Sequence, residues 1–348
     1  MNKHIFYIAA ACAALASCVK NEVRVDAPDK EITFQTVSTK AADPFKTDHK
    51  FYSYAYFLAK DNKWDEKHAA AQLYIDNAKI SHHGDHPNTP FWAADDIYYW
   101  PKQGSLTFFA WTDDTAAPSV GTGATVTCAH DTGIKITNYS VKENKNKDIL
   151  VADIAKDKTA NESATGTWEK GVPTVFRHAL AKVEFNVNKI KNYSNVKFKV
   201  KSITLNKVST KGTFTQGSPA EGWGWSDQDT PDDLTVFASP TGMEVTKTAE
   251  PAPAKFNALD SGDYSIVLPQ NFDNDTPTLT IVYDIITSYI TGHPVTETVT
   301  ETKALKDIYK SDWACKNKYV LWITLGLNEI YWDPSVEGWE DGAVTNIN

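Results

Sequence analysis

Residues 175–187, which read VFRHALAKVEFNV, contain two strand patterns of opposite phase. From Ala181 to Val187 apolar and polar residues alternate, which is typical of a strand with one buried and one solvated face. Upstream, the apolar set consists of Phe176, His178 and Leu180. A change of phase inside one apolar run predicts a β-bulge or a bend near Leu180. We interpret the stretch as the first strand of a second β domain.

The chain has 348 residues, enough for two domains that each bury a core of their own. It is acidic, with 44 Asp and Glu residues against 35 Lys and Arg residues and a formal net charge of -9. Only Arg24 and Arg177 are arginines, and no basic stripe offsets the acidic balance. This composition argues against nucleic acid as a partner.

Short strand-like runs recur on both sides of the opening stretch. They lie at residues 31–37, 51–58, 97–101, 106–111, 148–152, 196–200, 203–205, 264–268, 279–285 and 319–327. An alanine-rich run at 67–74 predicts one short helix, and a polar, glycine-containing run at 156–173 predicts a linker. Many short strands without an internal repeat predict an all-β protein made of β-sandwiches. We expect an N-terminal domain over 31–170 and a C-terminal domain over 171–348.

Residues 1–17 are predicted to be a lipoprotein signal peptide. A short basic start precedes an apolar run from Ile5 to Leu15 that is too short to span a bilayer. The run ends in Leu15-Ala-Ser-Cys18, which resembles the lipobox of bacterial lipoproteins. That resemblance implies cleavage before Cys18 and a lipid on its thiol as the membrane anchor. The alternative is an ordinary secretory signal, and residues 18–30 are expected to form a flexible leader.

Neither the cysteines nor the histidines predict a metal or catalytic site. Cys128 and Cys315 fall in different predicted domains, so two unpaired buried thiols are favoured over a disulfide. The run His82-His-Gly-Asp-His86 has metal-binding side chains but no distant ligand, which favours a solvated loop. His178 lies in a strand run without a nucleophile motif, which favours a core histidine over a catalytic base.

The segment from Trp223 to Asp233 combines two tryptophans with several carboxylates. The carboxylates offer oxygen ligands for Ca²⁺, but the glycine and closing glutamate of an EF-hand loop are missing, which favours an exposed acidic turn. Trp223 and Trp225 are able to stack on sugars if they are exposed, whereas most of the 11 tryptophans are expected in the core.

Several short sequence motifs, taken together and in order, resemble those of one known family. They are YWP at 99–101, LTFFA at 106–110, DILVA at 148–152, FRHALAKV at 176–183, LPQ at 268–270, Trp313, YVLWITL at 319–325, Ile330 and Trp339. In this order they resemble the Bacteroidetes fimbrillin family, the Mfa-like and FimA-like lipoproteins that polymerise into type V pili. The resemblance implies two tandem transthyretin-like β-sandwich domains.

The resemblance also implies how such subunits assemble. A lipidated precursor reaches the outer membrane, a protease specific for Arg or Lys removes the N-terminal strand, and a strand of the neighbouring subunit fills the groove. Here the removable segment is expected to be an edge strand over 32–37 with Ile32 and Phe34 in pockets. Arg24 precedes this strand, so the expected cut lies between Lys40 and Ala41. The expected donor is the C-terminal region 343–348 of another copy.

Three functions follow from these observations. The leading one is a non-enzymatic structural or accessory pilus subunit, anchored by lipid at the outer membrane. Its partners would be other pilin subunits and a host or bacterial surface ligand, and no cofactor is expected. The alternative is a cell-surface glycan-binding lipoprotein that uses Trp223 and Trp225. A surface hydrolase comes last, because no motif supports it.

Overall fold

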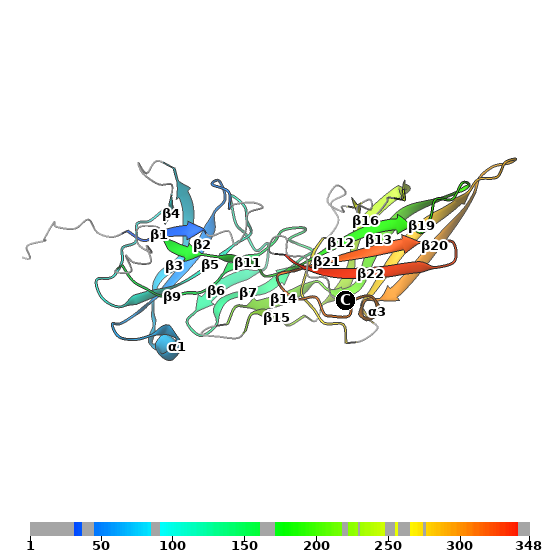
Figure 1. Ribbon diagram of the computed structural model, residues 1–348. Coiled ribbons are helices and arrows are strands. Elements are labelled where there is room, and N and C mark those ends of the chain that lie inside the picture. Colours follow the sequence, from blue (N-terminus) through cyan, green and yellow to red (C-terminus); the bar gives the residue numbers. More distant parts are fainter. Residues whose placement is uncertain are drawn as a thin grey trace, which may run out of the picture.

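The computed structural model describes residues 31–36, 45–84, 91–160, 171–217, 222–228, 230–247, 255–256, 265–273 and 276–339. The molecule is elongated and nearly all β, with the first strands of the chain at one end and the strands of residues 278–304 at the other (Figure 1). The helices of the described residues are α1 (Trp64–Lys67), the 3₁₀ helix η1 (His68–Ala70) and α3 (Leu305–Ile308). Within the described ranges, none is long and apolar enough to cross a membrane.

The N-terminal half is built on a nine-stranded sheet, which we call the wrapped sheet. Eight strands follow one another in space, and β9 (Ala155–Lys158) pairs with β5 beside them. In spatial order these eight are β10 (Val172–Thr174), β1 (Thr33–Thr36), β4 (Phe91–Ala94), β3 (Gln72–His83), β2 (Phe51–Leu58), β5 (Ser105–Thr112), β8 (Leu150–Ala152) and β11 (Phe176–His178).

The wrapped sheet curls until its two edges approach each other. A flat sheet would separate β1 from β5, four places away, by about 19 Å. The rings of Phe34 in β1 and Phe108 in β5 nevertheless lie 5.7 Å apart. The two edge strands β10 and β11 are also consecutive in the chain, with Val175 between them. The sheet therefore encloses a core of its own, which includes Ile32, Phe34, Ile80 and Trp92.

A second sheet of four strands packs on the outer face of the wrapped sheet. Its order is β15 (Gly224–Ser226), β14 (Lys211–Thr215), β7 (Gly133–Ser140) and β6 (Thr125–Ala129). All eight residues of β5 are buried, because alternate side chains face the two cores: Phe108 joins the enclosed core and Phe109 the core shared with Ile136 of β7. A strand covered on both faces reads as a continuous apolar run.

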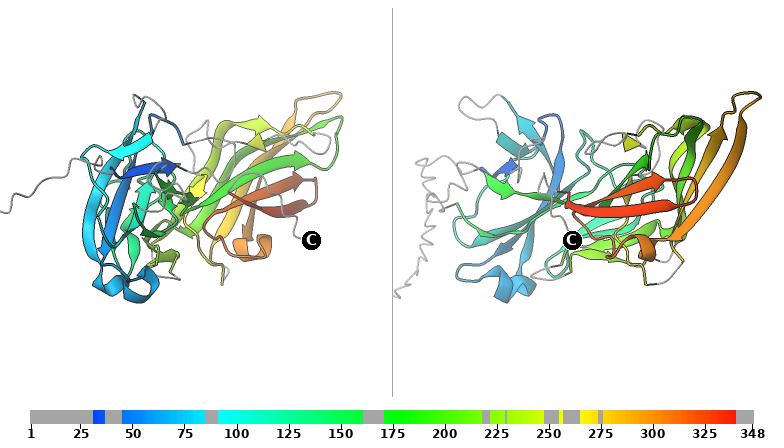
Figure 2. Two further views of the ribbon diagram at one scale, coloured as in Figure 1. Left: turned by 60° about the vertical axis from the view of Figure 1, so that its left-hand side comes forward. Right: turned by 45° about the vertical axis from the view of Figure 1, so that its right-hand side comes forward.

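The C-terminal half is a sandwich of two sheets. One sheet contains β17 (Lys255–Phe256), β12 (Ala181–Lys189), β21 (Asn317–Leu325) and β22 (Ile330–Gly338), with β18 (Ile266–Val267) also paired to β12. The other contains β16 (Pro231–Glu244), β13 (Val196–Ser209), β19 (Thr278–Thr287) and β20 (Val295–Ala304). Figure 2 shows the β19–β20 hairpin extending beyond the rest of the sandwich. The apolar faces of the two sheets share one core.

The predicted change of phase near Leu180 is confirmed, and the structure explains it. Residues 176–178 form β11, which pairs with β8 in the wrapped sheet, whereas residues 181–189 form β12, which pairs in parallel with β21. The chain bends at 179–180 and passes from one sheet to the other. As predicted, Ala181, Val183, Phe185 and Val187 are buried, but Asn186, expected on the solvated face, is buried as well. The interpretation of the stretch as a single strand is wrong, because its first residues complete the wrapped sheet.

Most of the other strand predictions are confirmed, although residues 196–200 and 203–205 lie in one strand, β13, and three further predictions need correction. Residues 97–101 form no strand, and only Tyr99 makes an isolated bridge, to Glu31. The predicted helix over 67–74 ends at Ala70, and β3 begins at Gln72. The ends of the predicted linker 156–173 belong to β9 and β10, and residues 161–170 lie outside the described part. β10, β11 and β14 pair with strands that precede residue 170, so strand pairing crosses the predicted domain boundary. The division into domains at 31–170 and 171–348 stays a prediction.

Candidate functional site

The first described strand, β1, is short and is held by few backbone pairs. Its register with β10 is parallel over three residues, and its antiparallel register with β4 covers Thr33 and Phe34. One further hydrogen bond runs from the Ile32 N–H to the Tyr98 carbonyl, at 2.8 Å. A strand with so short a ladder depends on its side chains for most of its stabilisation.

Two of those side chains are almost completely buried. Ile32 and Phe34 are each 2% exposed, as predicted for residues that occupy pockets. The Phe34 ring makes edge-to-face contacts with Phe51, at 5.6 Å, and with Phe108, at 5.7 Å. Next to it in the chain, Gln35 is exposed on the opposite face. The first strand and the residue before it therefore insert an aromatic and an aliphatic side chain into the enclosed core of the wrapped sheet.

The expectation that this segment is an edge strand is wrong. β1 has a neighbour on each side, β10 and β4, and the edge position belongs to β10. The partner β10 comes from a distant part of the sequence, and it reaches β1 only because the sheet curls. Removing β1 would therefore open a slot inside a sheet, with unpaired backbone groups on both walls.

Gly171, immediately before β10, lies against the backbone of β1. Its φ is +90°, and a Cβ built on it would lie 2.5 Å from the carbonyl carbon of Phe34 and 2.9 Å from the nitrogen of Gln35. Both distances are shorter than real side-chain contacts, and the neighbouring atoms are backbone. Glycine is therefore required here by the backbone conformation and by the neighbouring strand.

A Gly171→Ala substitution is expected to weaken the seating of β1. The strained backbone alone should cost about 1–3 kcal/mol, and the clash with β1 should add to it. Gly123→Ala is the matched control, because Gly123 has φ +79° and a methyl group added to it would meet no atom within 4 Å. Denaturant melts should show a larger loss for Gly171→Ala, and limited proteolysis should cut β1 earlier. Equal losses in the two variants would contradict the close contact.

Three predicted site residues lie outside the described part of the chain. They are the lipidation residue Cys18 and the residues of the expected cut, Lys40 and Ala41. The described part of the chain resumes at Phe45. The Phe45 ring stacks on Phe176, with the ring centroids 5.5 Å apart, and contacts Trp92, with the centroids 5.0 Å apart. Aromatic packing thus fixes the chain on the C-terminal side of the expected cut, as it fixes β1 on the N-terminal side.

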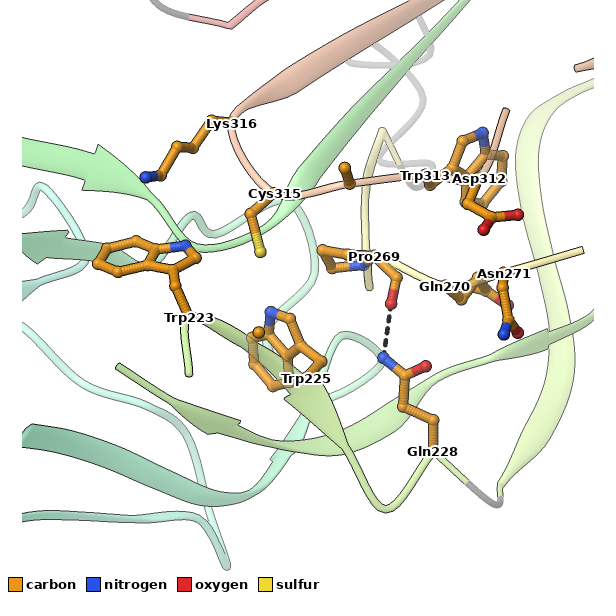
Figure 3. Close-up of a pocket in the computed structure, with 12 residues that line it drawn as sticks. Trp223, Trp225, Gln228, Pro269, Gln270, Asn271, Asp312, Trp313, Cys315 and Lys316 are labelled. Atoms are coloured by element: carbon orange, nitrogen blue, oxygen red, sulfur yellow. Dashed lines mark hydrogen bonds between the residues drawn. The ribbon is translucent and has the colours of Figure 1, made fainter. Parts of the chain in front are cut away.

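Trp223 and Trp225 line a separate hollow of about 510 Å³, shown in Figure 3. The other walls come from the segment after β18, Pro269–Asn271, and from the segment before β21, Asp312–Lys316. Both indole side chains are half-buried rather than fully exposed. The sequence therefore identified two residues of this pocket, and the fold brings the distant polar residues to them.

Cys128 and Cys315 are free, as favoured from the sequence, but both are partly exposed rather than buried. Cys315 lies beside Trp223 in the hollow of Figure 3. Burial raises the pKa of the Cys315 thiol to about 11, although the nearby Trp223 and Lys316 side chains act in the opposite direction. Burial also raises the pKa of Cys128 far above neutrality. Both thiols are therefore protonated at neutral pH and are weak nucleophiles.

Three of the other candidate ligands make contacts within the protein. His82 packs its ring against Trp92, at 5.1 Å, and His86 lies outside the described residues. Asp232 pairs with Lys142, which lowers the Asp232 pKa, and Asp233 accepts a hydrogen bond from the Lys207 N–H. No group of three or more potential metal ligands occurs in the described ranges.

His178 is half-buried rather than a core histidine, and two groups surround its ring. The ring pairs with the Asp148 carboxylate and stacks on the Trp339 indole, with the centroids 4.0 Å apart and the planes at 1°. Trp339 also donates its backbone N–H to the Lys316 carbonyl. These contacts attach the end of β22 to β11 and give His178 a structural role.

Comparison with known proteins agrees with this architecture. A fimbrial protein from Bacteroides vulgatus has a TM-score of 0.63 at 17% identity, and the alignment covers 89% of this chain and 99% of that chain. A candidate cell adhesion protein from Bacteroides uniformis has a TM-score of 0.49 at 13% identity, with 89% and 100% covered. No curated protein matches the sequence significantly. The family model described as fimbrillin-like matches residues 39–339, most of the chain, and the chain therefore belongs to the fimbrillin-like family.

Proposed function

We propose that this chain is a structural or accessory subunit of a surface pilus and that it assembles by strand exchange. Membership of the fimbrillin-like family supports the pilus role. The observation that carries the mechanism is β1: a four-residue strand at the start of the described fold, seated between β10 and β4, with Ile32 and Phe34 buried. The chain acts by assembly and adhesion rather than by catalysis, and it needs no cofactor.

Loss of β1 creates a site for another strand. The walls of the slot would be β10 and β4, whose facing N–H and C=O groups would lose their partners. The floor would be apolar, with the rings of Phe51 and Phe108 uncovered. Backbone pairing on both walls supplies affinity, and the two pockets select apolar side chains two residues apart in the incoming strand.

The donor in this proposal is the C-terminal region of another copy, residues 343–348. Its larger apolar side chains are Val344 and Ile347, which are three residues apart. Side chains on one face of a strand are two residues apart, so these two cannot both face the slot. A homotypic donor would fill one of the two pockets, and a donor from a different pilin with the spacing of Ile32 and Phe34 would bind more tightly.

Maturation follows from the position of the expected cut. Cleavage between Lys40 and Ala41 would release β1 together with the leader and the lipid on Cys18. Before cleavage the chain would be anchored at the outer membrane, and after cleavage it would be held in the pilus by its neighbours. The cut thus couples loss of the anchor to exposure of the slot.

Metabolic labelling with a clickable palmitate tests this sequence of events. Uncut chain is expected to carry the label at Cys18, whereas subunits sheared from the cell surface should begin at Ala41 and carry none. Lys40→Ala should leave the labelled precursor in the membrane fraction and remove the subunit from pili. Lys46→Ala, at an exposed lysine six positions later, is the matched control and should be processed normally.

Two results would contradict the proposal. Label that persists in a Cys18→Ala variant would exclude the lipid anchor. Sheared pili whose subunits retain residues 31–36 would exclude removal of β1.

A further inference from the structure

The hollow of Figure 3 has a fixed aromatic part. The Trp225 indole N–H donates to the Ala179 carbonyl at 2.6 Å, and the ring packs 5.6 Å from the buried Phe214. Trp223 stands edge-to-face on the same phenylalanine, at 5.2 Å and 85°. Because these contacts hold both indoles in place, a ligand that stacks on them does not have to order them.

The hollow also has polar groups around these rings. The Gln228 amide donates to the Pro269 carbonyl at 2.5 Å, which fixes the amide and leaves its oxygen as an acceptor. Asp312 accepts the Phe272 N–H at 3.0 Å through one carboxylate oxygen, and Asn271 is exposed. The Lys316 ammonium lies over one face of the Trp223 ring, 4.2 Å from its centre, so a stacking ligand would use Trp225 or the other face of Trp223. Donors and acceptors therefore surround an aromatic surface, with one cationic and one anionic side chain.

From this arrangement we propose that the hollow binds a carbohydrate, with one pyranose ring stacked on an indole. One face of a pyranose presents C–H groups, and hydroxyl groups surround its edge. The C–H face matches the aromatic surface, and the hydroxyls match the amide, carboxylate and ammonium groups. The volume of about 510 Å³ lies within the range of small-ligand sites. An entirely apolar ligand would leave the polar groups unpaired.

The site lies where sheets from the two halves of the molecule meet. Trp225 belongs to β15, in the sheet that packs on the wrapped sheet, whereas Pro269 and Lys316 belong to the C-terminal sandwich. It shares no residue with β1, β4 or β10. Carbohydrate binding therefore does not require strand exchange, and it would give each subunit along a pilus its own adhesive site.

A glycan array tests the proposal with the uncut chain, which starts at residue 18 and carries Cys18→Ala. The array holds neutral and acidic oligosaccharides together with proline-rich peptides, and the bound glycans are then titrated as free oligosaccharides. The wild-type chain is expected to bind a subset of glycans. Trp223→Ala and Asn271→Ala should each weaken binding by about tenfold.

The controls separate binding from folding. Trp322→Ala removes a half-buried tryptophan of β21 outside the hollow, and Asn328→Ala removes an exposed asparagine elsewhere, so both should bind as the wild type does. Thermal melts check each variant, and Asn271→Ala is informative even if Trp223→Ala unfolds, because Asn271 is exposed.

Absence of glycan binding, binding of the peptides alone, or unchanged affinity in Asn271→Ala would overturn the carbohydrate site. Because the proposed strand exchange requires the cut, a failure with the uncut chain leaves the pilus proposal untouched.

Discussion

A Phe185→Ala variant is expected to lose about 3–5 kcal/mol of unfolding free energy, as truncations of buried phenylalanines do. Phe185 is 4% exposed and lies in the middle of β12, with Leu321 of β21 on one side and Phe256 of β17 on the other. β12 is the first strand of the C-terminal sandwich and follows directly after β11 of the wrapped sheet. The cavity would therefore lie inside the C-terminal sandwich, where β12 has paired strands on both sides.

Lys182→Ala is the control for the opposite face of the same strand. Lys182 is partly exposed and pairs with Glu184 at 3.2 Å, in a network that Lys318 and Glu337 extend across the sheet. A solvated pair of this kind contributes less than about 1 kcal/mol. Urea denaturation of both variants provides the comparison, and similar losses would mean that the two faces of β12 have been assigned wrongly.

Removal of β1 is expected to have the second large effect. Burial of Ile32 and Phe34 is worth roughly 3–6 kcal/mol in transfer free energy, before the cost of ordering the strand. A chain that starts at Ala41 loses this burial and leaves the walls of the slot unpaired. Two apolar pockets between unpaired strands should then recruit a strand from another molecule, so the chain should associate with itself.

The sequence predicts best those strands whose pattern comes from local burial. β2 and β5 are covered on both faces, and both appear as continuous apolar runs with nearly correct bounds. β12 alternates because one of its faces lies on the core. In contrast, β20 reads VTETVTETKA and is exposed on both faces, so no alternation of apolar residues marks it.

The position of β1 could not be predicted from local pattern. Alternation shows that Ile32 and Phe34 share a buried face, but it does not show which strands lie beside them. The neighbour β10 is a three-residue strand, Val172–Thr174, at the end of a polar run that reads as a linker. Gly171 is the one local sign of a tight backbone approach, and a single glycine in a polar run is equally typical of an ordinary loop.

The pocket proposed to bind a carbohydrate was predictable in part. Trp223 and Trp225 are two residues apart, so a strand places them on one face, and this is visible in the sequence. Asn271 and Asp312 reach the same hollow only through the packing of the C-terminal sandwich against β15. No sequence spacing relates them to the tryptophans, and the structure is needed to bring the polar and aromatic groups together.

A complementing peptide distinguishes an open slot from general unfolding of the shortened chain. A synthetic peptide of residues 31–37, EITFQTV, carries both buried side chains and should occupy the slot. The same peptide with Asp in place of Phe34 keeps the backbone but would bury a charge among Phe51 and Phe108. Only the first peptide should suppress association.

The most direct measurement is light scattering on two chains at increasing concentration, one starting at residue 18 with Cys18→Ala and one starting at Ala41. The longer chain should remain a monomer, because β1 fills its own slot. The Ala41 chain should form oligomers that the EITFQTV peptide disperses and the Asp variant does not. A stable Ala41 monomer, or oligomers that neither peptide disperses, would contradict strand exchange at β1.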